Sequence, residues 1–300
     1  MTVPGQVLVC IGDLIQDVIV WPSGPLAHGT DNPATITRVR GGSAANVSAL
    51  AASTGAASRF IGRLGDDELG RHLERQMTDA GVEVRVQREG RTGSNVILVA
   101  PDGERTMFPD RGAAALLADV PPGWVADAGV VHAPAYSWAT PTCAAATLDL
   151  FAAGRAAGAL VSVDASSVDL ILRVGADAVL ATLRALAPDV LFANADEAAA
   201  LSLVEESLPG TSVVVKAGAD PVTITSPDGV RTRVAVAPVA DVRDTTGAGD
   251  AFAAGFLAAT LRNASPEQAV TAGHDLAAAV LSHPGASLTR TVPTPNEETP

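Results

Sequence analysis

The run Asp244-Thr245-Thr246-Gly247-Ala248-Gly249-Asp250 stands directly before a long apolar stretch, and its residue types suit the binding of an anion. Small residues let the backbone approach a ligand closely, and the N–H groups of Gly247, Ala248 and Gly249 would point out of a helix N-terminus, where the helix dipole favours a phosphoryl group. Asp250, in the first helical turn, would stay ionised and could accept a proton from a hydroxyl group. The alternative is an ordinary capped helix start with a favourable acid.

Two further groups of residues could hold the hydroxyl groups of a small molecule. Gly41 and Gly42 stand before a predicted helix, and Asn46 within that helix offers both a donor and an acceptor. Asp13 and Asp17 follow the first apolar run, and carboxylates accept hydrogen bonds from vicinal diols well. The alternatives are a flexible loop that enters an Ala-rich helix and solvated loop acids.

The elements that must position these residues alternate between short apolar runs and helical stretches. Strands are predicted at 7–11, 57–61, 129–133, 159–163, 189–193 and 213–216, and helices at 44–53, 66–80, 141–157, 177–186, 248–262 and 266–281. Short apolar runs are typical of strands buried on both faces of a parallel sheet, so the alternation predicts an α/β fold. Pro227-Asp228-Gly229, between 222–225 and 231–236, indicates a hairpin.

Residues 15–40 and 92–109 break this pattern, because alternating stretches follow one another there without a helix. They predict antiparallel strands that form a small sheet standing off the core, as a lid over the site. We therefore expect an α/β core made of 1–12, 41–91 and 112–300, with 13–40 and 92–111 as the inserted β lid.

The segment from Asp244 to Phe252 resembles the second signature of the ribokinase-like (PfkB) carbohydrate kinases, D-T-x-G-A-G-D, at every fixed position. The segment from Gly41 to Asn46 resembles the first signature, G-G-x-x-x-N, which touches sugar hydroxyls in that family, and residues 61–70 continue it as a structural turn. The resemblance covers the chain from Gly12 to about Gly285. It implies a ribokinase-like three-layer core with a mainly parallel sheet and a small β-sheet lid, and transfer of the γ-phosphoryl group of ATP to a primary hydroxyl of a sugar.

The same resemblance assigns roles to the residues already described. It implies that Asp250 is the catalytic base, that Gly247, Ala248 and Gly249 form the anion hole, and that Asp13 and Asp17 hold substrate hydroxyls.

The resemblance also implies where ATP and its cations lie. Asn194 and Glu197 match the family's N-x-x-E motif, which places Mg²⁺ and phosphate through water, and a hard cation on ATP keeps most of its waters. The alternative for these two residues is a helix cap and first-turn acid. Lys216 and Gly218 match a strand followed by G-x-x-G, although Pro221 replaces the second glycine and changes the shape of the ATP loop.

The remaining expectations on the nucleotide side concern the residues that flank the two last helices. Thr245 and His283 would line the nucleotide, and His274 could be a further neighbour of adenine or only a core histidine. A monovalent cation such as K⁺ could lie between the loop after residue 281 and the backbone near Asp244 and Thr246.

Composition excludes several other classes of protein. The 300 residues carry a net charge of −13 and only one lysine, which argues against a nucleic-acid or anionic-membrane partner. The five histidines lack metal-ligand spacing, and neither a Walker loop nor a G-x-S-x-G elbow is present. No apolar run is long enough to span a bilayer, and no secretory signal is expected. Two cysteines in apolar surroundings suit buried thiols in the cytoplasm.

The substrate has several candidates. A sugar is favoured, and Arg105 and Arg111 at the end of the lid segment could meet a carboxylate or phosphate, as on a 2-keto-3-deoxy sugar acid. A nucleoside is the alternative, with Trp21, Phe108, Tyr136 and Trp138 as the aromatic residues that could clamp its base. A non-catalytic sugar-binding or regulatory protein would share the fold. The resemblance also implies a homodimer formed through the lid.

Overall fold

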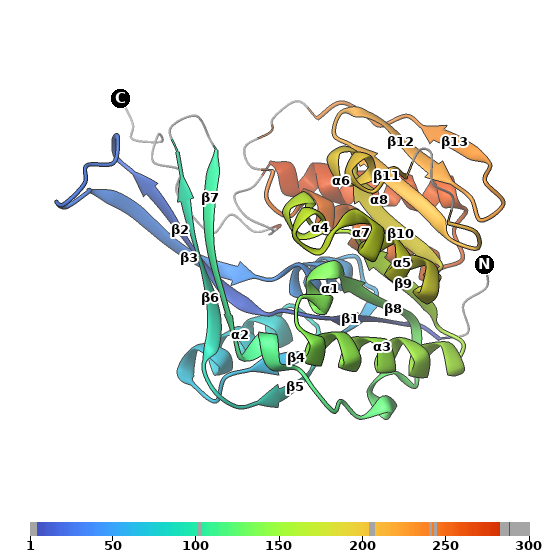
Figure 1. Cartoon of the computed structure of the whole chain (residues 1–300), viewed down its shortest axis with the longest axis horizontal. Coiled ribbons are helices and arrows are strands. Elements are labelled where there is room, and N and C mark those ends of the chain that lie inside the picture. Colours follow the sequence, from blue (N-terminus) through green and yellow to red (C-terminus); the bar gives the residue numbers. More distant parts are fainter. Residues whose placement is uncertain are drawn as a thin grey trace.

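A nine-stranded sheet forms the centre of the computed structural model, which describes residues 5–100, 104–203, 208–239, 242, 245–282 and 288 (Figure 1). Its order is β13-β12-β11-β10-β9-β8-β1-β4-β5. The strands are β1 (Val7–Ile11), β4 (Ala57–Leu64), β5 (Glu83–Arg88), β8 (Ala128–Pro134), β9 (Leu160–Asp164), β10 (Val190–Asn194), β11 (Ser212–Ala217), β12 (Asp220–Thr225) and β13 (Arg231–Val234).

The strands from β11 through β5 in this order all run parallel, while β12 and β13 are antiparallel at one edge. The chain places β4 and β5 on one side of β1 and then returns to place β8 on the other side. In such open sheets ligands bind beside the carboxyl ends of the strands, near the point where the strand order reverses. The topology therefore predicts that the residues after β1, β9, β10 and β11 lie at a ligand site.

Helices cover both faces of the sheet, which gives the predicted three layers. One face packs against α1 (Ser43–Ser53), α2 (Glu68–Asp79), α7 (Ala248–Leu261) and α8 (Pro266–Leu281). The other packs against α3 (Pro141–Ala156), α4 (Val168–Val174), α5 (Ala176–Leu186) and α6 (Ala195–Ala200). The strand β5 and the helix α4 were not predicted, because β5 mixes charged and apolar residues at the sheet edge and α4 has only seven residues.

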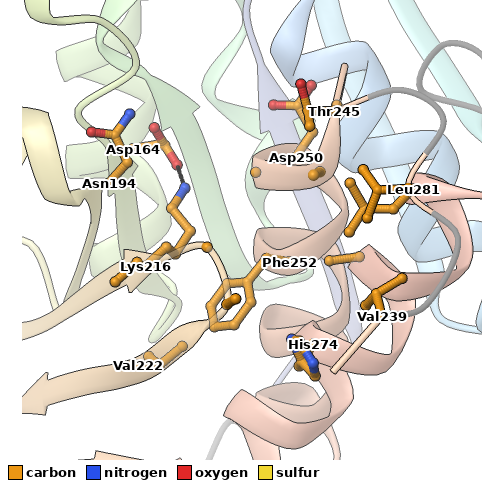
Figure 2. A pocket seen from close by; sticks show the side chains of 18 of the residues that line it. Asp164, Asn194, Lys216, Val222, Val239, Thr245, Asp250, Phe252, His274 and Leu281 are labelled. Carbon is orange, nitrogen blue, oxygen red and sulfur yellow. Dashed lines mark hydrogen bonds and ion pairs between the residues drawn. The ribbon is translucent and has the colours of Figure 1, made fainter. Parts of the chain in front are cut away.

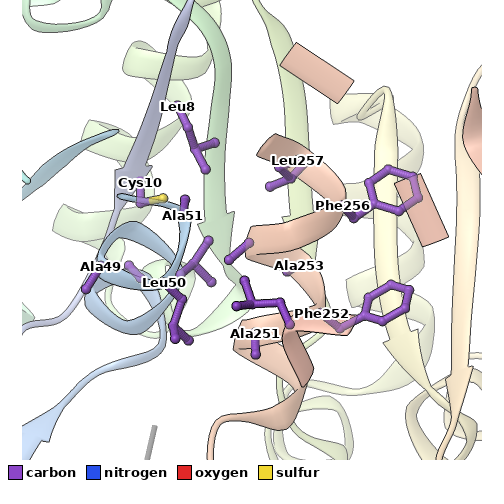
Figure 3. Packing of buried hydrophobic residues seen from close by; sticks show 14 of the residues in the cluster. Leu8, Cys10, Ala49, Leu50, Ala51, Ala251, Phe252, Ala253, Phe256 and Leu257 are labelled. Carbon is purple, nitrogen blue, oxygen red and sulfur yellow. The ribbon is translucent and has the colours of Figure 1, made fainter. Parts of the chain in front are cut away.

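Small residues hold α7 close to its neighbours, so its N-terminus is firmly placed. Figure 3 shows α1 and α7 packed together over β1, with alanines at much of the contact and Phe252 and Phe256 on the other side of α7. A Cβ added at Gly255 would overlap the backbone of Ala272 in α8, so the two helices touch nearly backbone to backbone. A helix that is apolar all round is buried, and α7 is buried over most of its length.

A separate four-stranded sheet stands off the large one (Figure 1). It consists of β2 (Ile15–Pro22), β3 (Ala34–Gly41), β6 (Thr92–Val99) and β7 (Arg105–Gly112), in the order β3-β2-β6-β7. The expectation of purely antiparallel strands was wrong, because β2 and β6 pair in parallel. They continue from β1 and β5, which both run the same way in the large sheet, so both leave it at the same edge. The boundaries predicted between core and lid stay a prediction.

Two side-chain contacts tie the small sheet to the core. Asp67 caps α2 by accepting from the N–H of Gly70 at 2.8 Å, and it also accepts from the N–H and hydroxyl of Thr92, the first residue of β6, at 2.8 and 2.6 Å. Asp13, after β1, forms a two-pronged ion pair with Arg111 near the end of β7, at 2.6 and 2.7 Å. The turn Gly65-Asp66-Asp67, within the predicted structural turn at 61–70, thus fixes where β6 starts.

The cysteines and the helices of the described part of the chain agree with a fold that has neither a disulfide nor a membrane-spanning helix. Cys10 and Cys143 are both buried and free, as the sequence predicts. None of the helices in the described part of the chain has the length and apolar character needed to cross a membrane.

Candidate active site

A cavity of about 550 Å³ opens along the carboxyl edge of the large sheet, between β9–β12 and the helices α7 and α8. Figure 2 shows its arrangement, with Lys216 and Asp164 on the sheet side and Asp250 facing them from the first turn of α7. The far end is apolar and is lined by side chains such as Val222, Val239 and Leu281. One end can therefore receive a charged group and the other a flat apolar one.

Asp250 lies at the polar end, held by two donors from α1. Ser43 Oγ donates to its Oδ1 at 2.7 Å, and Asn46 Nδ2 donates to its Oδ2 at 2.9 Å. Burial raises the pKa of Asp250 to about 6; the two hydrogen bonds and Lys216 oppose this rise and Asp164 adds to it. The carboxylate is thus ionised at neutral pH yet poised to accept a proton, as a general base should be.

The backbone before Asp250 forms the expected helix start. Gly247 is the N-cap of α7 with a φ of 74°, in the left-handed region that favours glycine, and the helix begins at Ala248. No side chain caps this end, and the Ala248 N–H makes only a long hydrogen bond of 3.3 Å to the Thr245 carbonyl oxygen, so an anionic ligand could take the place of a side-chain cap. A Cβ added at Gly249 would lie 3.3 Å from Lys216 Nζ, so the ammonium group stands beside these amides.

Lys216 is paired with an acid that sequence reasoning missed. Its Nζ donates to Asp164 Oδ2 at 2.9 Å and lies 5.9 Å from the centre of the Phe192 ring. Burial, the largest single effect, lowers the pKa of Lys216, but the charge and hydrogen bond of Asp164 together with the charges of Glu197 and Asp250 make the net shift upward, so the ammonium stays charged. Asp164 is the last residue of β9, and a carboxylate at the end of a predicted buried strand was the available signal.

Asn194 and Glu197 form the helix cap that was the alternative interpretation of this motif. The Glu197 N–H donates to Asn194 Oδ1 at 2.8 Å, and the Glu197 carboxylate accepts from the Asn194 N–H and Nδ2 at 2.8 and 2.9 Å. Both residues nevertheless line the cavity, and burial followed by the charge of Asp164 raises the pKa of Glu197. The two residues can therefore cap the helix and form part of the cavity wall at the same time.

These oxygen groups are compatible with a hydrated Mg²⁺. Asp164 and Glu197 face the same cavity, and the charge of Asp164 disfavours ionisation of Glu197, an effect that a nearby cation would relieve. Among the described residues, no cluster of three or more His, Cys, Asp or Glu side chains could hold a metal directly. The donor set thus fits an ion that keeps most of its waters and is carried mainly by phosphates.

The residues predicted to hold the sugar gather on the other side of Asp250, where β2 and β3 meet α1. Asp17 accepts from Asn95 Nδ2 at 3.3 Å, and burial, the larger effect, together with the charge of Asp250 raises the pKa of Asp17 to about 6. A Cβ at Gly41 would overlap the Asp17 carboxylate, and one at Gly42 would overlap the backbone of Asp13. Close packing therefore requires glycine at both positions, against Asp17 for Gly41 and against Asp13 for Gly42.

Asp13 and Arg111, both predicted to meet the substrate, are bonded to each other. Their side chains are only 13% and 17% exposed, so the pair is largely removed from solvent. Arg105 lies at the opposite end of β7, beside Val99, and does not join them. Two expected binding residues thus form a neutral pair at the base of the small sheet.

At the apolar end, His274 Nε2 lies 2.8 Å from the carbonyl oxygen of Ala237, and the ring lines the cavity. Gly218 and Ala219 form the tight turn between β11 and β12 and also line it, while Pro221 belongs to β12. Thr245 lines the polar end. The predicted roles of Asp244 and His283 lie outside the described residues, so of the K⁺ site only Thr246 is described.

The aromatic residues considered as a base clamp do not converge. Phe108 is 58% exposed on β7 and Trp21 lies on β2, whereas Trp138 packs against the α3 side of the core. Tyr136, after β8, lines the cavity.

The chain matches known proteins over almost its whole length. The model of the pfkB family carbohydrate kinases matches residues 6–294. The ATP-dependent ribose-1-phosphate kinase of Halopiger xanaduensis is 33% identical over 282 residues, 90% of this chain and 88% of that protein. The fructokinase of Klebsiella pneumoniae is 29% identical over 90% of this chain and 89% of its own. The crystal structure of adenosine kinase from Sinorhizobium meliloti superposes with a TM-score of 0.82 and 26% identity, covering 94% of this chain and 95% of that one.

With a half-buried carboxylate at a helix N-terminus, a lysine beside it and a cavity of about 550 Å³ at the carboxyl edge of the sheet, the chain belongs to the pfkB family of carbohydrate kinases. It has the ribokinase-like fold and is an ATP-dependent carbohydrate kinase, as its sequence predicts.

Proposed function

We propose that the chain transfers the γ-phosphoryl group of ATP to a primary hydroxyl of a sugar or sugar phosphate, with Asp250 as the base. The hydroxyl proton passes to the Asp250 carboxylate as the hydroxyl oxygen forms its bond to phosphorus, and the bond to the ADP oxygen breaks. The amides of Gly247, Ala248 and Gly249 would stabilise charge on the moving phosphoryl group, and Lys216 would add to this from the other side.

The observation that carries this proposal is the position of Asp250 between two different sets of residues. On one side lies the cavity with Lys216 and Asp164, and on the other lie Asn46 and Asp17; Ser43, which donates to Asp250, also lines the cavity. A base for phosphoryl transfer must stand where acceptor and nucleotide meet, because most of the rate enhancement comes from positioning and charge stabilisation.

The remaining residues take roles that follow from their places. Asp17, Asn46, Gly41 and Gly42 would contact the sugar, and Asp13 with Arg111 would hold the wall behind them. Thr245 and Gly218 would line ATP, with His283 beside adenine. Asn194 and Glu197 would meet Mg²⁺ through water; when bound, that ion neutralises phosphate charge. A K⁺ near Asp244 and Thr246 remains part of the proposal.

For the substrate, a sugar phosphate gains support from the ribose-1-phosphate kinase to which the chain is similar. A nucleoside is the second candidate, supported by the adenosine kinase structure and by Tyr136 at the cavity wall.

Assembly and location complete the proposal. A homodimer through the small sheet is supported by an apolar row of Val18, Val96 and Phe108 across β2, β6 and β7, of which Val96 and Phe108 are exposed. A cytoplasmic location is supported by the two free cysteines.

The test is ADP release with Mg-ATP against ribose 1-phosphate, fructose, 2-keto-3-deoxy sugar acids and adenosine, with wild type and Asp250→Asn. Removing the base should lower turnover by ~10²–10⁴-fold while sugar binding, measured by calorimetry, stays nearly unchanged. Asp149→Asn, on the exposed face of α3, is the matched control and should behave as wild type. Near wild-type turnover by Asp250→Asn would overturn its role as base. ATP binding without ADP release on any member of the panel would point to a sugar outside it, and absence of ATP binding to a non-catalytic protein.

A further inference from the structure

Arg40 lies one residue before the Gly41-Gly42 turn, and its side chain is half-buried at the sugar side of Asp250. Its Nη2 donates to Asn46 Oδ1 at 3.4 Å, while Asn46 Nδ2 donates to Asp250 Oδ2 at 2.9 Å. Two consecutive hydrogen bonds thus connect a guanidinium group on β3 with the carboxylate on α7, through a buried amide on α1.

The chemistry of the three groups allows the two hydrogen bonds to run in only one direction, from Arg40 through Asn46 to Asp250. A guanidinium group has donors only, an ionised carboxylate has acceptors only, and an amide has one of each on its two sides. If the Asn46 amide turned over, its oxygen would face the Asp250 carboxylate and its NH₂ group would face Arg40, so both contacts would become repulsive. Because Asn46 is only 6% exposed, water cannot readily replace either partner.

We propose that Arg40 is a positioning residue for phosphoryl transfer, which holds the Asn46 amide so that it donates to Asp250 and keeps that carboxylate ionised and aimed at the acceptor hydroxyl. The inference rests on the proposed role of Asp250 as base and adds a residue outside the G-G-x-x-x-N and D-T-x-G-A-G-D runs.

The charges around Asp250 explain why a cation is needed on this side. Asp17 on β2 and Asp164 on β9 both face Asp250 with like charge, and the buried Cys10 thiol lies near it on β1. Lys216 on β11 is the cation on the nucleotide side, and it is already paired with Asp164. Burial lowers the pKa of Arg40, and the negative charge of Asp250 opposes this shift, so Arg40 lies within the field of that carboxylate. By reciprocity the guanidinium favours the ionised carboxylate.

The experiment compares Arg40→Gln, which removes the charge, with Arg40→Lys, which keeps it, by measuring kcat against pH at saturating ATP and sugar. Arg38→Gln is the matched control, because Arg38 lies two residues earlier on the same strand and is exposed. Arg40→Gln should shift the acidic limb of the profile upward by about one pH unit and lower kcat at pH 7 by ~10-fold or more. Arg40→Lys should keep the limb near its wild-type position but lose several-fold in kcat, because an ammonium group does not reproduce the planar fork.

A wild-type limb and kcat in Arg40→Gln would overturn the proposal, since a purely structural residue would lower the amount of folded enzyme without moving the pH dependence. If thermal melting shows that Arg40→Gln does not fold, Arg40→Lys decides, and an unchanged kcat in that variant counts against the proposal. Asp250→Asn, measured in parallel, separates the two failures. Turnover retained by Asp250→Asn would overturn the base itself, whereas an inactive Asp250→Asn beside a wild-type Arg40→Gln would overturn only the role of Arg40.

Discussion

Asp250 has two sides, which we propose bind the nucleotide and the sugar, and the two are built in different ways. The nucleotide side rests on the large sheet and on α7 and α8, and most of its lining is apolar or backbone, with one ion pair between Lys216 and Asp164. The sugar side is formed where the small sheet meets α1, and there charged side chains dominate, with Asp17 and Arg40 close to the base and Asp13 paired with Arg111.

Because of this difference, the two sides should recognise their ligands in different ways. A cavity made of rigid elements recognises a ligand by shape, and α7 is fixed by near backbone contact with α8. A site that spans two sheets depends on how they are joined, here through the contacts of Asp67 with Thr92 and of Asp13 with Arg111. Changes on the sugar side should therefore alter sugar kinetics and leave ATP binding unchanged, and changes on the nucleotide side should do the reverse.

The sharpest test of this separation is Gly41→Ala. The new Cβ would overlap the Asp17 carboxylate and push it out of place, while the backbone at this position is not in the left-handed region. Because displacement of a binding group by about 1 Å can cost ~10²-fold, KM for the sugar should rise by about that factor with KM for ATP unchanged. Initial-rate kinetics with each substrate varied in turn measure both values.

The matched control for Gly41→Ala is Gly24→Ala, in the connection between β2 and β3, where an added Cβ meets nothing within 4 Å. It should leave both KM values at their wild-type level. A parallel rise of both KM values in Gly41→Ala would contradict the separation of the two sides.

Lys216→Met tests the nucleotide side and should have a smaller effect. Loss of the ammonium beside the α7 amides should raise KM for ATP by roughly 10-fold, the usual worth of a charged hydrogen bond, with KM for the sugar little changed. The single variant also leaves Asp164 without its partner, which destabilises the fold.

The double variant Lys216→Met with Asp164→Asn separates these two effects. It should regain much of the lost melting temperature, because no unpaired buried charge remains, yet keep the high KM for ATP. A double variant that recovers wild-type ATP kinetics would show that Lys216 only neutralises Asp164.

Most of the fold could be predicted from the sequence because its signals are local. Short apolar runs such as 129–133 and 189–193 are strands, and the helices at 248–262 and 266–281 lie within one residue of the bounds that the structure gives. The parallel pairing of β2 with β6 could not be predicted. It depends on the edge of the large sheet at which the segments after β1 and β5 both leave it.

The site was predicted where one motif brings its own residues together, as in the run that ends at Asp250. Asp164 and Arg40 were missed because their roles depend on partners far away in the sequence, Lys216 and Asp250. Asp13 and Arg111 were predicted as separate binding residues for the same reason, since no local pattern indicates that they are bonded across 98 positions.

The smallest predicted effect is on the free energy of unfolding, which is lowered when the half-buried Asp17 carboxylate is ionised. Burial raises the pKa of Asp17 from 3.8 to about 6, so the folded protein holds this proton more tightly than the unfolded chain does. Unfolding then releases a proton between pH 4 and 6, and the free energy of unfolding falls as the pH rises through that window. Above pH 6 the ionised carboxylate is a net burden on the fold.

Asp17→Asn should therefore stabilise the protein at pH 8 while it weakens sugar binding. The amide keeps an oxygen that can accept from Asn95 but carries no charge, and after allowance for partial exposure the gain should be on the order of 1 kcal/mol, or roughly 2 °C in Tm. At pH 4 the difference should nearly vanish, because wild-type Asp17 is then protonated in the folded state. Asp31→Asn, at an exposed position of the same inserted segment, should show no such pH-dependent gain in thermal melts. A gain for Asp17→Asn that is equal at pH 4 and pH 8 would mean that the substitution acts through packing, and that the charged side of the site carries no electrostatic cost at this residue.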